Sequence, residues 1–302
     1  MRLSRNTINR LIVQRGRVFW TMIICLNGNR PKKDVPGGRR RIRMITKIDG
    51  ADINYEIFGK DDGVPVLILH GWGASIEAMS PIWRFLESKN KFKIYVIDFP
   101  GESNKSSVPP KPWGVPEYGE MVKKFIDQNK IIKPHVIAHS FGGRVTIYLA
   151  SKYQDLFDKI ILTDAAGLKK KMTFKKFVNR YKFKIGKFIL NTFTKKEERD
   201  KKLQEYRDKH SSTDYKALKS DVMRETFKLV INLDLKDKLK DITCPTLLIW
   251  GENDTDTPVY MGQIMEKEIK DAGLVVLKDA KHFSYIDKMN EYNIIVDNFL
   301  AN

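Results

Sequence analysis

The sequence predicts an α/β fold built on a mostly parallel, doubly wound sheet. Three observations support this prediction. Short, continuous apolar runs have the profile of strands that are buried on both faces. Segments with apolar residues at helical spacing separate these runs, and residues that favour turns mark the boundaries. Strands that alternate with helices in this way pair in parallel, because each helix returns the chain to the same end of the sheet.

An antiparallel hairpin is expected where the regular signals begin. Met44–Ile48 and Asp52–Phe58 are strand-like segments, and the Asp-Gly pair at 49–50 between them is a strong turn signal. We therefore expect a hairpin to flank the parallel strands.

The remaining strands and helices follow in alternation. The run VPVLIL at Val64–Leu69 is apolar throughout and ends at a His-Gly pair, as a doubly buried strand would. Further strands are predicted at Phe92–Asp98, Pro134–Ala138, Lys159–Thr163, Thr246–Trp250 and Leu274–Leu277. Helices are predicted at Ile76–Ser88, Val115–Asn129, Gly142–Ser151, Val259–Ile269 and Glu291–Leu300.

Charge divides the chain into three parts. Residues 1–43 carry 12 Lys and Arg against one acid, and residues 167–240 carry 23 against 10. The remaining residues, 44–166 and 241–302, carry 20 against 26 and are therefore slightly acidic. We expect these two stretches to form the core domain, 1–43 to be a basic extension, and 167–240 to be a helical lid inserted into the core. Aromatic and basic residues do not interleave, so no nucleic-acid partner is expected.

The basic extension has several explanations that the sequence leaves open. It is either disordered or the product of a mis-called start, since fold-like sequence begins at Met44. A targeting segment is an alternative, because an apolar run at 18–26 follows several arginines, although no A-x-A-like cleavage site follows it. A functional basic arm is another. No apolar run approaches the roughly 20 residues of a membrane-spanning helix. Two cysteines, Cys25 and Cys244, cannot form a disulfide framework, which favours a cytoplasmic protein.

A candidate nucleophile lies between a predicted strand and a predicted helix. The stretch AHSFGG at 138–143 fits the pattern G-x-S-x-G, with Ala138 in place of the first glycine. Small residues are needed beside Ser140, because larger side chains would clash across so sharp a turn. The turn would expose Ser140 at a helix N-terminus, where backbone dipoles favour developing negative charge. The alternative is an ordinary serine that caps a helix.

A serine nucleophile needs a base, and the chain has five histidines. His282 is the favoured base, because a loop after the last strand can bring its imidazole over the carboxyl edge of the sheet. His139 adjoins the serine and should point away from it. His70 ends an early strand, where we expect it to shape a loop at the substrate pocket.

The base in turn needs a carboxylate that fixes its tautomer. We choose Asp254, which follows the penultimate strand and gives the chain order Ser, Asp, His of this type of site. Asp164, at the end of the strand before the inserted segment, is the second candidate, and Asp256 is the third.

Donors for an oxyanion are expected from the glycine-rich turn HGWG at 70–73. Its backbone can offer the N–H of Trp72 alongside the N–H of Phe141. A turn of this kind could also bind phosphate, but the chain lacks both G-x-G-x-x-G and a P-loop lysine here. We predict no cofactor and no metal site.

Together these motifs resemble the α/β-hydrolase superfamily, from about Met44 to the C-terminus. By this resemblance Ser140, Asp254 and His282 match the triad positions, and the chain is expected to be a carboxylesterase-like serine hydrolase. Two departures are Ala138 and the loop at 100–103, which lacks the usual second glycine. The motifs that carry the resemblance are HGWG at 70–73, IDFPG at 97–101, AHSFGG at 138–143, WGENDTDTP at 250–258 and AKHFSYID at 280–287.

The inserted segment supplies the remaining candidate pocket residues, Phe174, Phe177 and Tyr181. With Ile185 and Phe188 they approximate one apolar stripe, and lysines fill the other positions. One interpretation is a lid that packs on the core with a solvated outer face. The other is a stripe that lines an acyl pocket beneath a basic face that receives an acidic carrier protein, an arrangement that resembles esterases acting on acyl groups carried by such proteins.

Two hypotheses about function follow. In the first, the protein is an enzyme that cleaves a small-molecule carboxylic ester, or a related acyl or C–C bond, through an acyl-enzyme on Ser140. In the second, it is a signalling or binding protein with a hydrolase fold, and its basic lid engages an acidic partner. A fluorophosphonate probe discriminates between them, because it labels only an activated serine.

Overall fold

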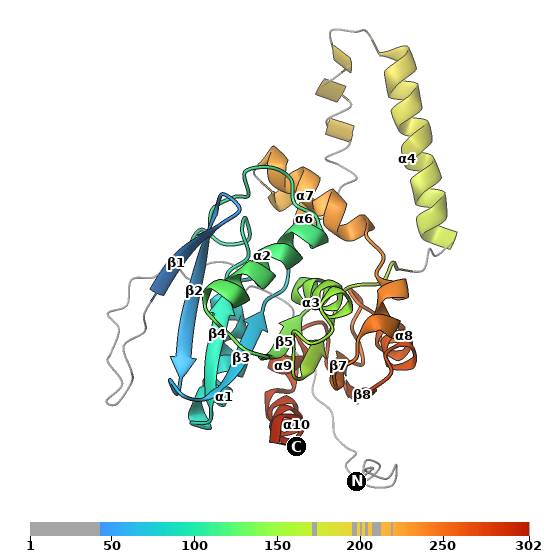
Figure 1. Cartoon of the computed structure of the whole chain (residues 1–302). Coiled ribbons are helices and arrows are strands. Elements are labelled where there is room, and N and C mark those ends of the chain that lie inside the picture. Colours follow the sequence, from blue (N-terminus) through green and yellow to red (C-terminus); the bar gives the residue numbers. More distant parts are fainter. Residues whose placement is uncertain are drawn as a thin grey trace, which may run out of the picture. The chain divides into compact units, whose positions relative to one another are not determined.

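The computed structural model describes residues 43–170, 174–194, 198–199, 201–202, 205–206, 213–218 and 220–301. Within these residues the strands form one eight-stranded sheet in the order β1-β2-β4-β3-β5-β6-β7-β8 (Figure 1). The strands are β1 (Arg43–Ile48), β2 (Ala51–Gly59), β3 (Val64–Leu69), β4 (Phe92–Ile97), β5 (His135–His139), β6 (Ile160–Thr163), β7 (Thr246–Gly251) and β8 (Ala272–Leu277).

The pairing confirms the predicted fold class. β1 and β2 form the antiparallel hairpin, and β2 also pairs antiparallel with β4. Every other pair in this sheet, from β4 to β8, is parallel. The turn of the hairpin is at 49–50, where both residues have positive φ, as an Asp-Gly turn allows.

Helices connect the parallel strands. The helices are η1 (Ile76–Met79), α1 (Ser80–Ser88), α2 (Val115–Gln128), α3 (Phe141–Lys152), α4 (Phe174–Phe193), α6 (Thr213–Ala217), α7 (Asp221–Asn232), η2 (Lys236–Asp241), α8 (Tyr260–Glu268), α9 (Ser284–Asp287) and α10 (Met289–Ala301). The segment at 167–240 contributes α4, α6, α7 and η2. None of the described helices is long and apolar enough to cross a membrane.

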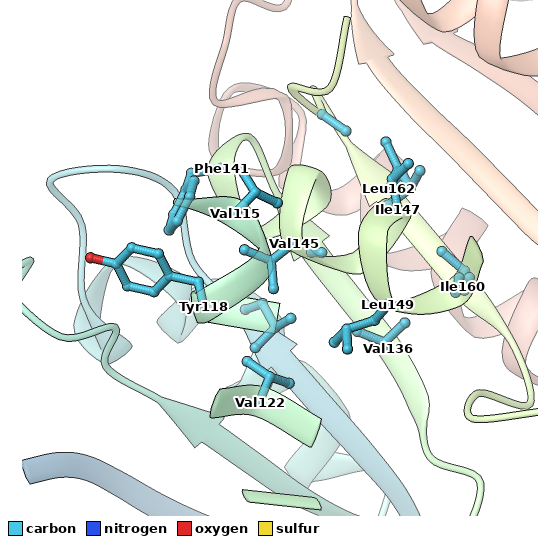
Figure 2. Packing of buried hydrophobic residues seen from close by; sticks show 14 of the residues in the cluster. Val115, Tyr118, Val122, Val136, Phe141, Val145, Ile147, Leu149, Ile160 and Leu162 are labelled. Atoms are coloured by element: carbon cyan, nitrogen blue, oxygen red, sulfur yellow. The ribbon is translucent and has the colours of Figure 1, made fainter. Parts of the chain in front are cut away.

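Two hydrophobic clusters lie on opposite faces of the sheet. In β3 the residues alternate between them: Leu67 and Leu69 belong to the first cluster, and Val66 and Ile68 to the second. Helices α2, α3 and α8 complete the first cluster, and α1, α9 and α10 complete the second. Figure 2 shows part of the first cluster, where side chains of α2 and α3 meet above β5 and β6. These strands are therefore buried on both faces, which explains their continuous apolar sequences.

The register of the central strands brings their carboxyl ends together. Leu69 of β3 pairs with Ala138 of β5, and Thr163 of β6 pairs with both His139 of β5 and Ile249 of β7. Residues that follow these four strands therefore meet at one edge of the sheet, which is where functional residues of open α/β sheets gather.

Candidate active site

The turn between β5 and α3 holds Ser140 in a strained conformation. Ser140 has φ 48° and ψ −107°, outside the regions that a serine ordinarily adopts. The close packing around the turn explains its glycines: a methyl group added at Gly142 would lie 2.4 Å from the carbonyl oxygen of Leu69. The turn therefore places the serine hydroxyl at the beginning of α3, as the sequence predicts.

His282 lies beside this hydroxyl. Its Nε2 is 3.0 Å from Oγ of Ser140, within hydrogen-bond distance. His139 fixes the backbone of His282, because its Nε2 donates a hydrogen bond to the carbonyl oxygen of His282 at 2.8 Å. His139 is buried and points away from Ser140 Oγ towards the His282 loop, where it also contacts Phe283 and Tyr285.

Asp254 is the carboxylate that contacts the histidine. Its Oδ2 is 2.8 Å from Nδ1 of His282. Its Oδ1 accepts hydrogen bonds from the backbone N–H groups of Asp256 and Thr257, at 2.7 and 2.9 Å. The Thr257 hydroxyl lies 2.7 Å from Oδ2. The turn after β7 thus fixes the carboxylate of Asp254 before any substrate binds. Asp256, the third candidate acid, contributes its backbone N–H to this turn, and the carboxylate that contacts His282 is that of Asp254.

Asp164, the second candidate acid, has a different role. Its Oδ1 accepts the Gly251 N–H at 2.8 Å, and its Oδ2 accepts the N–H and the hydroxyl of Ser284 at 3.1 and 2.6 Å. None of these atoms belongs to the imidazole. Asp164 therefore joins the loop that carries Asp254 to the loop that carries His282.

Burial, charges and hydrogen bonds shift the pKa values of His282, Asp254 and His139. Burial alone would lower the pKa of His282, but the hydrogen bond and negative charge of Asp254 outweigh it and raise that pKa above its ordinary value. Burial would raise the pKa of Asp254, but its hydrogen bonds to His282 and Thr257 lower it. Burial and the nearby His282 lower the pKa of His139 to about 3, so His139 stays neutral.

The HGWG turn lies against the serine. A methyl group at Gly71 would lie 3.3 Å from Cβ of Ser140 and 2.8 Å from Nδ1 of His139, so only glycine fits. The ring of Trp72 contacts that of Phe141, with centroids 5.4 Å apart. Phe141 is the first residue of α3, where backbone N–H groups have no partner within the helix.

His70 shapes this turn instead of offering polar atoms to a ligand. Its Nδ1 is 2.7 Å from the carbonyl oxygen of Gly71, and its Nε2 is 2.9 Å from the backbone nitrogen of Phe99. The ring therefore donates from Nδ1 and accepts at Nε2, which makes it neutral, and burial lowers its pKa. The side chain is fully buried.

Glu102 occupies the loop in which the sequence lacks the usual second glycine. Its Oε2 accepts a hydrogen bond from the backbone N–H of Gly73 at 2.5 Å. The changed loop thus ties itself to the HGWG turn. Sequence analysis identified the departure but not the contact, because nothing in the local pattern relates residues 29 positions apart.

Helix α7 contributes residues that sequence reasoning missed. The ring of Phe227 contacts that of Trp72, with centroids 5.3 Å apart, and the Thr226 hydroxyl accepts the Trp113 N–H at 3.0 Å. The helical spacing of Met223, Phe227 and Val230 could have indicated this face. Of the predicted pocket residues on α4, the side chains of Phe174 and Phe177 lie outside the described residues, and Tyr181 is 55% exposed.

Asp254, Asp256 and His282 could together offer ligand atoms to a metal ion. However, Asp254 and His282 already bond to each other, and His282 also faces Ser140. A serine, a histidine and a buried carboxylate in this sequence of hydrogen bonds can move a proton from the hydroxyl to the imidazole without a metal.

Residues 64–289 match the sequence model of the α/β hydrolase fold family. The chain therefore belongs to this family and is a hydrolase. A pimeloyl-[acyl-carrier protein] methyl ester esterase of Nitrosospira multiformis is 26% identical over 258 residues, 75% of this chain and 92% of the relative. A 2-hydroxy-6-oxononadienedioate/2-hydroxy-6-oxononatrienedioate hydrolase of Escherichia coli is 22% identical over 270 residues, 82% of this chain and 91% of the relative. The enol-lactonase of Burkholderia xenovorans has the same fold, with a TM-score of 0.67 at 19% identity over 86% of this chain and 100% of the other.

Proposed function

We propose that the protein is a serine hydrolase that cleaves a carboxylic ester through an acyl-enzyme on Ser140. The observation that carries this proposal is the pair of hydrogen bonds that joins Ser140 to His282 at 3.0 Å and His282 to Asp254 at 2.8 Å. Nucleophile, base and orienting acid in this geometry are the arrangement that acyl transfer requires.

The reaction begins when Nε2 of His282 takes the hydroxyl proton as Oγ of Ser140 attacks the ester carbonyl. Asp254 stabilises the imidazolium that forms. The N–H groups of Trp72 and Phe141 donate to the oxyanion of the tetrahedral intermediate. When the intermediate collapses, His282 returns its proton to the leaving alkoxide, which departs as an alcohol. Water then attacks the acyl-enzyme with His282 again as base, and releases the carboxylic acid and free Ser140.

The names of the relatives narrow the class of substrate that this protein is expected to cleave. One relative is named for the methyl ester of a carrier-bound acyl group, and another as a hydrolase of hydroxy-oxo-diacids. We favour the ester, because Ser140, His282 and Asp254 can form and hydrolyse an acyl-enzyme from an ester without a further catalytic group. A carrier-linked acyl substrate remains a prediction, supported by the basic charge of residues 167–240. It predicts that hydrolysis of the carrier-linked ester weakens steeply with salt while that of a simple methyl ester does not.

The decisive experiment treats the full chain with a fluorophosphonate probe and then with a panel of p-nitrophenyl esters of increasing acyl length. We expect labelling of Ser140 and hydrolysis of at least one ester. Ser140→Ala should remove the labelling and lower turnover by about 10⁶-fold, the scale seen when a triad serine is lost. Its melting temperature should be unchanged, because the hydroxyl contributes little packing.

An unlabelled wild-type protein with an intact fold would contradict the proposal. That result would favour the second hypothesis, a binding protein with a hydrolase fold. Full activity in Ser140→Ala would also refute the assignment of the nucleophile.

A further inference from the structure

Helix α4 has two apolar faces, and the described residues cover one of them. Phe183 stacks on Tyr206, with ring centroids 5.3 Å apart and planes inclined by 13°. A methyl group added at Gly186, on the same face, would lie 2.1 Å from the Tyr206 hydroxyl oxygen. This side of α4 therefore packs against another part of the inserted segment.

The opposite face of α4 is exposed. Ile185, Phe188 and Ile189 are 55%, 67% and 49% exposed. Successive residues of a helix are about 100° apart, so these three lie within one arc of roughly 100°, and Phe183 lies across the helix from them. Large apolar side chains that gather on one exposed face indicate an interaction surface.

By the helical period Lys182 and Lys184 flank this exposed face, whereas Lys187 lies nearer to Phe183. Lys182, Lys184 and Lys187 are exposed, and none of them forms an ion pair with a carboxylate among the described residues. The sequence of α4 adds Lys175, Lys176 and Arg180, and contains no Asp or Glu between 174 and 193. The partner of this surface should therefore combine negative charge with an apolar interior.

We propose that α4 docks in the plane of a bilayer surface rich in anionic lipid. Ile185, Phe188 and Ile189 would lie at the boundary between headgroups and acyl chains, and the lysines would extend to the phosphates. The helix is too polar to cross a membrane, which agrees with an orientation in the plane. An acidic carrier protein is the other partner that could contact the lysines, and it is an outcome of the test below. The bilayer explains both the lysines and the apolar side chains.

The test measures binding of the full chain to phosphatidylcholine vesicles with and without about one third phosphatidylglycerol, by flotation at low salt. We expect binding to the anionic vesicles and much weaker binding to the neutral ones. The triple variant Lys182→Gln, Lys184→Gln, Lys187→Gln should lower the partition coefficient on the order of 100-fold, because each lysine near the surface contributes about fivefold. The double variant Ile185→Ser, Phe188→Ser should lower it at least about tenfold, from lost apolar burial.

Two matched controls isolate α4. Lys236→Gln, Lys238→Gln, Lys240→Gln changes the net charge equally on η2, where all three side chains are exposed. Ile132→Ser, Ile294→Ser removes apolar side chains that are 80% and 62% exposed on the core domain. Both controls should bind like the wild type. The basic extension is the same in every variant, so a difference between variants belongs to α4.

Four results would overturn the proposal. One is absence of binding to anionic vesicles, and another is an equal loss in the η2 control, which would reflect net charge alone. The third is a change in hydrolysis of a small soluble ester by the α4 variants with vesicle binding unchanged, which would make α4 a cover for the site. The fourth is a loss of activity by these variants on a carrier-linked substrate alone, which would indicate the carrier protein as the partner. Ser140→Ala should bind vesicles like the wild type, so failure of the proposed function leaves this test intact.

Discussion

At the scale of single residues, the three histidines around the serine have separate roles. His70 holds the HGWG turn, His139 holds the backbone of His282, and His282 faces the hydroxyl. Each of the first two has a hydrogen bond to backbone that explains its position, and burial lowers the pKa of both. The imidazole that is free to exchange a proton with Ser140 is His282.

The two aspartates at this edge should respond differently to the same substitution. Asp254→Asn should lower kcat by up to about 10⁴-fold, because the amide cannot fix the required tautomer of His282. Asp164→Asn should have a mild effect on kcat, because Asp164 bonds to Gly251 and Ser284 and not to the imidazole. Steady-state kinetics of the two variants on one ester check this prediction. A larger loss in Asp164→Asn would reverse the assignment of the acid.

The pH dependence of the same proteins gives a second readout. His282 must be neutral to accept the serine proton, and its pKa is raised above the ordinary value of about 6.5. Wild-type kcat/KM should therefore be full at alkaline pH and fall as pH decreases through a midpoint above about 6.5. In Asp254→Asn the hydrogen bond and charge that raise this pKa most are lost, while burial and the weaker attraction of Asp164 and Asp256 remain, so the midpoint of the residual activity should move to lower pH.

The order of motifs along the chain was enough to predict that Ser140, Asp254 and His282 lie close together, because each follows a strand whose carboxyl end lies at the same edge of the sheet. The contact between Glu102 and Gly73 and that between Phe227 and Trp72 were not predictable. They join loops and helices that are distant in sequence, and no local pattern encodes their separation.

At the scale of elements, apolar runs located the strands to within one or two residues. β3 was predicted at Val64–Leu69 and is found there, and α2 was predicted at Val115–Asn129 and ends at Gln128. The largest difference is at Ile76–Ser88, where a single helix was predicted. The structure has η1 followed by α1, which begins next to Pro81. The short helix α9 was missed, because four residues do not show periodicity.

The tight turn between β5 and α3 predicts the effect of a small substitution. Gly142→Ala should destabilise the protein by about 1–3 kcal/mol, because the new methyl would collide with the backbone carbonyl of Leu69, which cannot move without disturbing β3. It should also lower activity, because Ser140 is two residues away. Denaturant unfolding and ester hydrolysis measure the two effects.

Gly273 provides the matched control for that substitution. A methyl group there would meet no atom within 4 Å, and φ is not positive. Gly273→Ala should leave both stability and activity unchanged or slightly increase stability. Equal behaviour of the two variants would show that the turn adjusts more readily than the distances indicate.

At the scale of the whole molecule, the sequence predicted the mostly parallel pairing, because each parallel strand needs a helical crossover before its neighbour, but it did not predict the strand order. Charge did not help to predict the fold, since the core residues are slightly acidic and the basic residues belong to other parts of the chain. The interpretation of residues 167–240 as a lid stays a prediction, as does the pocket role of α4.

The basic extension allows a prediction at this scale. Deletion of residues 1–42 should leave the melting temperature and the hydrolysis of a small ester unchanged, because this part of the sequence has no sustained apolar periodicity to bury. Calorimetry and a p-nitrophenyl ester assay check the expectation. A fall of several degrees in melting temperature would show that the extension packs on the core domain. The shortened chain begins at Arg43, the first residue of β1, so the hairpin is kept.

Direct pairing of β6 with β7 has a consequence for how such a protein can change over evolution. The chain leaves the sheet after Thr163 and returns at Thr246 on the neighbouring strand, so the whole excursion between them begins and ends at adjacent points of an unbroken ladder. Beyond Asp164, which joins the loops that carry Asp254 and His282, its length and composition can therefore drift, or be exchanged with another hydrolase, without shifting the register of β6 and β7. Selection can therefore change this excursion while the hydrogen bonds among Ser140, His282 and Asp254 are inherited unchanged.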